Sequence, residues 1–150
     1  MKVRFRHPSI FDVGRLYEIE RLSFEHPFPQ SVILSQVILH SDTSLVAVVG
    51  NKVVGYAIAA IKVLPEGRAL HLLNFAVDPS YRGQGIGRLM LRVLEKLARK
   101  KGLKAIVLEV STINYPAIRL YESEGFEKIK VLKNYYPWGE DAYLMKKELK

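Results

Sequence analysis

The sequence predicts an α/β protein with a mixed β-sheet and helices on both faces of that sheet. Strand-like and helix-like segments alternate along much of the chain, which is typical of this class. A glycine-rich turn stands in mid-chain, between a strand-like segment and a helix-like one. With 150 residues, 49% of them apolar, the chain is long enough for a real core, and we expect one domain over residues 1–150.

The strands are predicted from short apolar or β-branched runs that end at turn residues. Seven segments have this composition: 2–6, 45–49, 53–63, 69–77, 105–110, 127–132 and 142–147. Gly50-Asn51 separates the second and third segments, which is a hairpin signal. The third and fourth segments are joined by the turn residues Pro65-Glu66-Gly67.

The helices are predicted from apolar residues at helical spacing and from their caps. Ser9 followed by Asp12 indicates the start of a helix over about 10–22, and Pro27 and Pro29 exclude regular structure after it. A second helix is expected over 31–39. A third follows the glycine-rich turn and ends near Gly102, and a fourth runs from about 114 to 125.

The composition limits the possible classes of protein. No cysteine is present, so disulfides, thiolate metal sites and a cysteine nucleophile are excluded. No apolar run reaches the roughly 18 residues that span a bilayer, and residues 1–6 are too charged for a signal peptide. We therefore expect a cytoplasmic protein that has no membrane partner.

Positive charge is concentrated in the third helix. The net charge is +8, and eight Lys or Arg residues stand against Glu95 alone between positions 82 and 104. Such a surface can attract a polyanionic cofactor or RNA, or it can simply face solvent. No nucleic-acid recognition motif accompanies it, so we expect no specific nucleic acid. Only Arg82 and Arg88 lie close enough to the glycine-rich turn to be candidates for ligand binding.

The glycine-rich turn, residues 83–87, has the properties of a phosphate site. Three glycines in five residues let the backbone approach a ligand, and the first N–H groups of a helix have no internal partner. The positive end of the helix dipole favours an anion at the same place. The spacing fits neither the Walker pattern nor the dinucleotide fingerprint.

The pattern Arg82-x-x-Gly85-x-Gly87, preceded by a strand and Asp-Pro, resembles the acetyl-CoA pyrophosphate loop of the GNAT N-acetyltransferase superfamily. Two further signatures resemble the RimI-like and archaeal protein N-terminal acetyltransferases: Glu109 with Asn114 and the run 120–126, and the runs 134–137 and 140–145. The likeness covers nearly the whole chain. It implies a mostly antiparallel sheet of about seven strands, with a V-shaped splay between the fourth and fifth.

The resemblance implies transfer of an acetyl group from acetyl-CoA to the N-terminal α-amino group of a protein, by direct attack in a ternary complex. The expected partners are protein N-termini, such as those of ribosomal or nascent chains, and the expected state is a monomer or weak homodimer. An α-amino group has a pKa of about 7.7–8.0 and a lysine about 10.4, so neutralising lysine costs about 3.5 kcal/mol more. This favours the terminal amine. Lysine or polyamine acetylation, or a non-catalytic RNA- or ribosome-binding role, are the alternatives.

Two residues are candidates for proton transfer. Glu109 lies in an apolar run where burial would make it a better base, and it matches a glutamate of RimI-like enzymes, acting directly or through water. Its alternative is an ion pair at a strand end. Tyr121 matches the family's catalytic tyrosine, the general acid for the leaving thiolate. Its alternative is a tyrosine packed in its helix.

The resemblance also implies two sets of binding residues. The residues expected to bind the cofactor are Phe75, Ala76, Val77, Arg82, Gly83, Gln84, Gly85, Ile86, Gly87, Arg88, Asn114 and Tyr121. Among them, backbone N–H groups of 75–77 would hold the oxyanion, and Asn114 would contact pantetheine or cap its helix. The residues expected to bind the acceptor are Glu25, Phe28, Tyr135 and Tyr136.

His71 and Glu109 are candidates for a metal site. His71 and Glu109 would approach each other if their strands were neighbours, and some archaeal relatives hold zinc with a His and a Glu at matching positions. Two ligands are too few for a structural zinc site. We therefore expect no metal requirement, and a histidine that lies in its strand or relays a proton through water.

Overall fold

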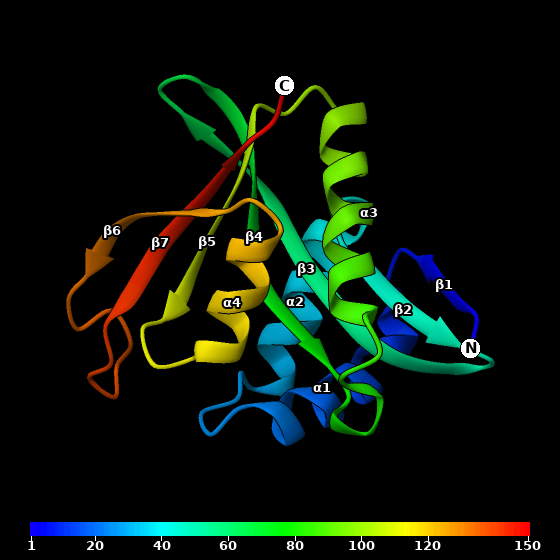
Figure 1. Cartoon of the computed structure of the whole chain (residues 1–150). Coiled ribbons are helices and arrows are strands. Elements are labelled where there is room, and N and C mark those ends of the chain that lie inside the picture. The colour runs from blue at the N-terminus through cyan, green and yellow to red at the C-terminus, as the bar shows by residue number, and fades with distance from the viewer. The chain divides into compact units, whose positions relative to one another are not determined.

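The computed structural model describes residues 1–150 and contains the seven strands and four helices that were expected (Figure 1). In chain order these elements are β1 (Val3–Arg6), α1 (Val13–Ser23), α2 (Gln30–His40), β2 (Leu45–Val49), β3 (Lys52–Leu64), β4 (Gly67–Val77), α3 (Ile86–Lys100), β5 (Ala105–Ser111), α4 (Tyr115–Ser123), β6 (Glu127–Leu132) and β7 (Ala142–Glu148). Short 3₁₀ turns occupy Ile10–Asp12, Ser41–Thr43 and Pro79–Tyr81.

The start of the first helix differs from its prediction. Ser9 and Asp12 form the expected capping box, but the residues inside the box make a 3₁₀ turn, and α1 begins only at Val13. Asp12 also accepts two hydrogen bonds from the Arg6 guanidinium, at 2.8 and 2.9 Å. These bonds hold the pKa of Asp12 below its usual value. The cap therefore joins β1 to the entry of α1.

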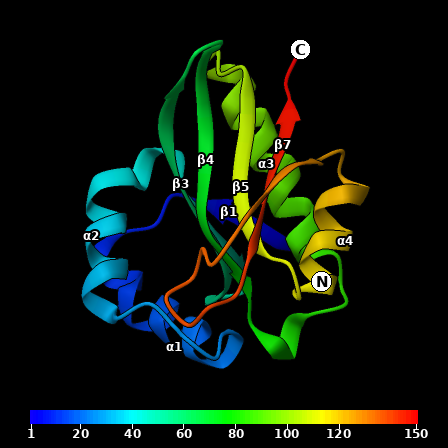
Figure 2. The same ribbon diagram turned by 90° about the vertical axis from the view of Figure 1, so that its left-hand side faces the viewer.

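The strands are hydrogen-bonded in the order β1-β2-β3-β4-β5-β7-β6. β4 and β5 pair in parallel, whereas β1–β2, β2–β3, β5–β7 and β6–β7 pair antiparallel. This mixed, mostly antiparallel sheet confirms the predicted fold class. The parallel pairing of β4 with β5 joins Leu70–Leu72 to Ile106–Leu108, and the predicted splay between these strands stays a prediction. Figure 2 shows β3, β4 and β5 running side by side.

The chain forms two compact units. Unit 1 consists of Met1–Ala60 and Leu73–Leu94, and unit 2 consists of Ile61–Leu72 and Glu95–Lys150. β3, β4 and α3 each begin in one unit and end in the other. The expectation of one domain over 1–150 stays a prediction.

Both faces of the sheet are covered in unit 1. On one face, α1 and α2 build a core with β2, β3 and β4, whose fully buried members include Leu16, Ile33 and Tyr56. Gly55 precedes Tyr56 and so faces the other way. A Cβ on Gly55 would lie 3.1 Å from the Ala76 carbonyl oxygen and 3.6 Å from Met90 of α3. The glycine therefore lets α3 lie close to the second face.

The side chains of β5 alternate between the two faces of the sheet, and this alternation determines on which face Glu109 lies. Ile106, Leu108 and Val110 are buried on one face of the strand, so Val107 and Glu109 point to the other. In the register, Val107 lies opposite His71 of β4. His71 and Glu109 thus share a face on neighbouring strands, about two residue steps of 3.3 Å apart along the sheet.

Candidate active site

The glycine-rich turn of unit 1 has an open backbone at the start of α3. Gly83 and Gly85 adopt φ values of 76° and 81°, in the left-handed region that favours glycine. No heavy atom lies within 4 Å of where a Cβ would stand on either residue. The Gly85 carbonyl accepts the N–H of Leu89 at 3.0 Å, so the amides of residues 86–88 form the first turn of α3. The residues present fit the predicted diphosphate site.

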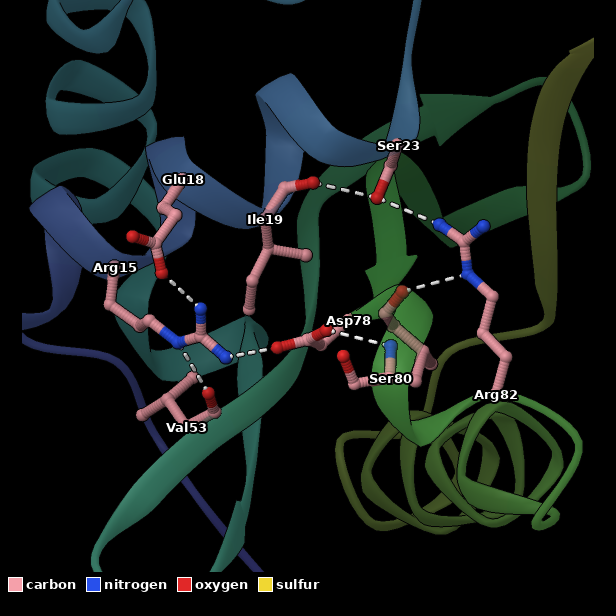
Figure 3. Close-up of polar contacts among 9 residues, drawn as sticks. Arg15, Glu18, Ile19, Ser23, Val53, Asp78, Ser80 and Arg82 are labelled. Carbon is pink, nitrogen blue, oxygen red and sulfur yellow. Dashed lines mark hydrogen bonds and ion pairs between the residues drawn. The ribbon is translucent and has the colours of Figure 1, made fainter.

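The side chain of Arg82 is held by the protein itself (Figure 3). Its Nε donates to the carbonyl of Val77 at 3.0 Å, and its Nη2 donates to the hydroxyl of Ser23 at 2.9 Å. Ser23 in turn donates to the carbonyl of Ile19, one turn back in α1. Sequence reasoning assigned Arg82 to the cofactor. These contacts show that the side chain also joins the end of β4 to the end of α1.

A second contact joins α1 to the segment before the turn (Figure 3). Arg15 forms an ion pair with Asp78, whose side chain is 6% exposed, and its Nε donates to the Val53 carbonyl at 2.8 Å. Burial alone would raise the pKa of Asp78, but hydrogen bonds from Arg15 and from the Ser80 N–H lower it below its usual value. Asp78 also caps the 3₁₀ turn that leads into the glycines.

We expect Arg15→Met to destabilise the fold by about 2 kcal/mol, between the values for exposed and fully buried pairs. In thermal unfolding at pH 7, Tm should fall by about 4–8 °C. Because the folded pKa of Asp78 is lowered, its stabilising contribution is present above the unfolded pKa and is lost as pH falls through the folded one. The difference from the unmodified protein should therefore shrink below about pH 4.

The matched control is Glu18→Gln, because Glu18 pairs with the same arginine but its side chain is 54% exposed. This change should cost less than about 0.5 kcal/mol. Equal losses in the two variants would contradict a specific role for the Arg15–Asp78 pair.

The end of β4 contains the backbone groups expected to hold an oxyanion. The N–H of Phe75 donates to the Asn74 side-chain oxygen at 3.0 Å. That amide is therefore engaged by its neighbour. Asn74 is 7% exposed and was not singled out from the sequence.

The segment 24–29 contains the residues expected to meet the acceptor. The side chain of Glu25 is 86% exposed and lies 3.9 Å from the His26 ring. Phe28 is 40% exposed, and its N–H donates to Oε2 of Glu20 at 2.9 Å. The segment thus presents a carboxylate and an aromatic ring at the surface of unit 1, and a buried glutamate holds its backbone.

Unit 2 brings together His71 and Glu109. His71 Nε2 and Glu109 Oε1 lie 2.8 Å apart, with side chains 18% and 14% exposed. The two side chains are in direct contact, whereas one of the expected arrangements was a proton relay between them through water. An ionised carboxylate only accepts, so Nε2 carries the shared proton and Nδ1 of a neutral ring is left as an acceptor. The structure contains no group of three or more His, Cys, Asp or Glu that could hold a metal ion.

Three tyrosines belong to the same part of unit 2. Burial, and then the charge of Glu109 and a hydrogen bond with it, raise the pKa of Tyr135. Burial and the charges of Tyr135, Glu109 and Glu140 raise the pKa of Tyr136 to about 12. Burial, with a smaller contribution from Tyr136, raises the pKa of Tyr121. Glu109 and these phenols therefore form one connected group, in which each phenol is protonated at neutral pH.

The loop that carries Tyr135 and Tyr136 makes several contacts within itself and with β5. The two rings meet edge to face, with centroids 5.0 Å apart, and Tyr136 stacks on Trp138 at the same distance. Glu140 accepts a hydrogen bond from Ser111 of β5 at 2.7 Å. Asp141 accepts the N–H of Asn134 at 2.8 Å. These bonds fix the tyrosines beside the end of β5, where Glu109 lies.

Asn114 caps its helix, which is the structural role predicted beside contact with pantetheine. Its side-chain oxygen accepts the N–H of Ala117 at 3.4 Å, which caps α4 ahead of Pro116. α4 then places Tyr121 in its second turn, 6% exposed, with its ring 5.7 Å from that of Phe126.

Residues 13–126 match the acetyltransferase (GNAT) family. The chain belongs to this family. The acetyltransferase is 36% identical to an N-alpha-acetyltransferase of Saccharolobus solfataricus, over 96% of its own length and 92% of the relative's. It is 36% identical to the ribosomal protein bS18-alanine N-acetyltransferase of Escherichia coli, over 89% of each chain.

Solved structures confirm the fold of the acetyltransferase. The crystal structure of Ard1 from Thermoplasma volcanium matches it with a TM-score of 0.92 at 28% identity, covering 100% of this chain and 99% of the other. None of the helices combines the length and apolar character needed to cross a membrane. Both the predicted enzyme class and the predicted GNAT fold are confirmed.

Some residues near the candidate site of the acetyltransferase were not predicted from the sequence. Glu20, Asn74 and Arg15 are polar or charged residues that take part in the contacts described above. One signal was available for Glu20, because it lies seven residues after Val13, on the apolar face of α1. Neither Asn74 nor Arg15 stands in a recognisable pattern.

Proposed function

We propose that this protein transfers the acetyl group of acetyl-CoA to the N-terminal α-amino group of proteins. The observation that carries the proposal is the nearly full-length similarity to two enzymes named for that reaction, one archaeal and one bacterial. The acceptors would be protein N-termini, such as those of ribosomal or nascent chains. The E. coli relative is named for a ribosomal protein.

The cofactor would be held in unit 1. Amides of 83–88 would bind the diphosphate, because they stand at the positive end of α3 and the positions of a Cβ on Gly83 and on Gly85 meet open space. Arg82 would act chiefly by fixing the turn, since its guanidinium is bonded to Val77 and Ser23. The thioester supplies the electrophilic carbonyl, and backbone N–H groups at the end of β4, among residues 75–77, would stabilise the negative charge that develops on its oxygen.

Glu109 would remove the proton that the amine must lose. A terminal amine is partly neutral at pH 7, so a modest base, acting directly or through one water, is sufficient. His71 would fix the orientation of that carboxylate through the 2.8 Å bond between them. The bond from amine nitrogen to carbonyl carbon forms, the carbon–sulfur bond breaks, and the sulfur leaves with the electron pair.

Tyr121 would give a proton to the departing sulfur. Burial raises its pKa, so the phenol is protonated throughout the neutral range and is always available as a donor. Its proton would reach the thiolate, while the amine proton goes to Glu109, so the two transfers balance. The acceptor's backbone would meet Tyr135 and Tyr136, and its first side chain would meet Phe28, with Glu25 near the amine.

An acetylation assay over a peptide panel tests this function. The peptides share one sequence with an internal lysine and differ in their first two residues, and a parallel set has a blocked N-terminus. We expect a single acetyl group at the free terminal amine, located by mass spectrometry, and no reaction of the blocked set. Acetylation of the blocked peptides at lysine, or of polyamines instead of peptides, would replace this proposal with the lysine or small-amine alternative.

A further inference from the structure

Glu20 is a buried carboxylate without a cationic partner. It lies in α1, is 2% exposed, and takes part in no ion pair with lysine, arginine or histidine. Isolated buried charges are costly, so they persist only where hydrogen bonds replace the lost water. Glu20 accepts three such bonds, and all three donors come from other elements of unit 1.

The three bonds reach the parts of unit 1 that carry the proposed reaction. Oε1 accepts the hydroxyl of Tyr56 in β3 and the side-chain N–H of Asn74 in β4, the latter at 2.7 Å. Oε2 accepts the backbone N–H of Phe28 at 2.9 Å. The side-chain oxygen of Asn74, which the bond to Glu20 does not use, accepts the N–H of Phe75. One carboxylate therefore ties the 24–29 segment to the last residues of β4.

We propose that Glu20 is a positioning residue that fixes the 24–29 segment against the end of β4 and so controls acceptor binding and the choice of first residue. This inference rests on the proposed function, in which Phe28 contacts the acceptor's first side chain and the end of β4 holds the oxyanion. Glu20 itself touches neither substrate. It acts through the Phe28 backbone and through Asn74.

The chemistry of the three donors explains why a carboxylate is needed. A backbone N–H can only donate, so the group facing Phe28 must be an acceptor. If glutamine replaces Glu20 with its oxygen toward Phe28, its NH₂ group faces Asn74 and Tyr56. The Tyr56 hydroxyl can rotate to accept, but Asn74 can turn its oxygen inward only by losing its bond to Phe75. In either orientation, glutamine therefore leaves one buried donor without an acceptor. The two oxygens of the glutamate, in contrast, accept the bonds of all three donors.

The unmodified protein provides a test that needs no variant and no activity. Phe28 lies in an irregular segment, so only the bond to Glu20 would protect its N–H from exchange with solvent. We expect this amide to exchange at least about 100-fold more slowly than the exposed amides of the same segment, measured by NMR in D₂O. Exchange at the same rate as its exposed neighbours would overturn the proposal.

Kinetics of Glu20→Gln and Tyr56→Phe test the functional part. We expect Glu20→Gln to raise KM for the acceptor about tenfold and to reduce the preference among first residues, with the Kd of acetyl-CoA within twofold of the original. Tyr56→Phe keeps the bond to Phe28 and should change the acceptor KM less than threefold. A folded Glu20→Gln protein with unchanged KM and preference would overturn the proposal.

A second variant and the choice of acceptor make the result of these assays interpretable. If Glu20→Gln does not fold, Glu20→Asp keeps the charge but shortens the side chain by one methylene, and the same changes in KM and amide exchange are expected. The acceptor in these assays is whichever amine the unmodified protein acetylates in the peptide panel. Failure of the α-amine function would therefore appear in the panel, and failure of the positioning role would appear in the variants.

Discussion

Replacing Glu109 with glutamine should lower kcat for peptide acetylation about 100- to 1000-fold, the lower part of the range expected when a general base is removed. Glutamine keeps an oxygen that can accept the hydrogen bond from His71, so the local geometry should survive. What is lost is the capacity to take the amine proton. The Kd of acetyl-CoA should change little, because the glycine-rich turn does not include Glu109.

Initial rates across pH 6–9 provide the measurement. The rate should rise with pH in both proteins as the α-amine is deprotonated, near pH 7.7–8.0, while the variant stays below the unmodified protein throughout. Glu127→Gln is the control, because Glu127 is an exposed residue of β6 in the same unit, and it should leave kcat unchanged. Equal turnover of Glu109→Gln and the unmodified protein over this range would exclude Glu109 from the mechanism.

Local patterns were sufficient to predict the elements of this fold. The hairpin at Gly50, the helix cap at Ser9 and the end of the third helix before Gly102 depend on residues close together in sequence, and the structure contains each of them. The order of the strands in the sheet was not predicted, since pairing between distant segments leaves no local signal, and the family resemblance implied only a mostly antiparallel sheet with a splay between the fourth and fifth strands. The parallel contact of β4 with β5 is the decisive example.

Contacts between distant segments could not be predicted in the same way. The bond from His71 to Glu109 depends on the β4–β5 register, and a shift by one residue would place the two side chains on opposite faces. Arg82 was expected to face the cofactor because its position matches a motif, but a motif carries no information about Ser23, which lies 59 residues away. Hydrophobic periodicity gives Glu20 a buried position but does not identify its three donors.

The second large effect is expected from Tyr121→Phe, which should lower kcat about 10- to 100-fold. The loss should be smaller than for Glu109, because a thiolate with a conjugate-acid pKa near 8.5 leaves more readily than an amine proton is lost without a base. Phenylalanine keeps the ring, so its contact with Phe126 and the burial of α4 should be preserved. Calorimetry should therefore find the Kd of acetyl-CoA within about threefold of the original, which separates proton donation from binding.

The pH dependence distinguishes a proton donor from a packing residue. Because burial raises the pKa of Tyr121 above that of an ordinary phenol, the unmodified enzyme should lose no activity through this group up to about pH 10. The defect of Tyr121→Phe should then be constant over that range. Tyr115→Phe is the matched control, since Tyr115 begins the same helix and is 60% exposed. Equal kcat in both variants would assign Tyr121 to the core of unit 2, whereas a defect confined to Tyr121→Phe would identify its hydroxyl as the group that meets the leaving sulfur.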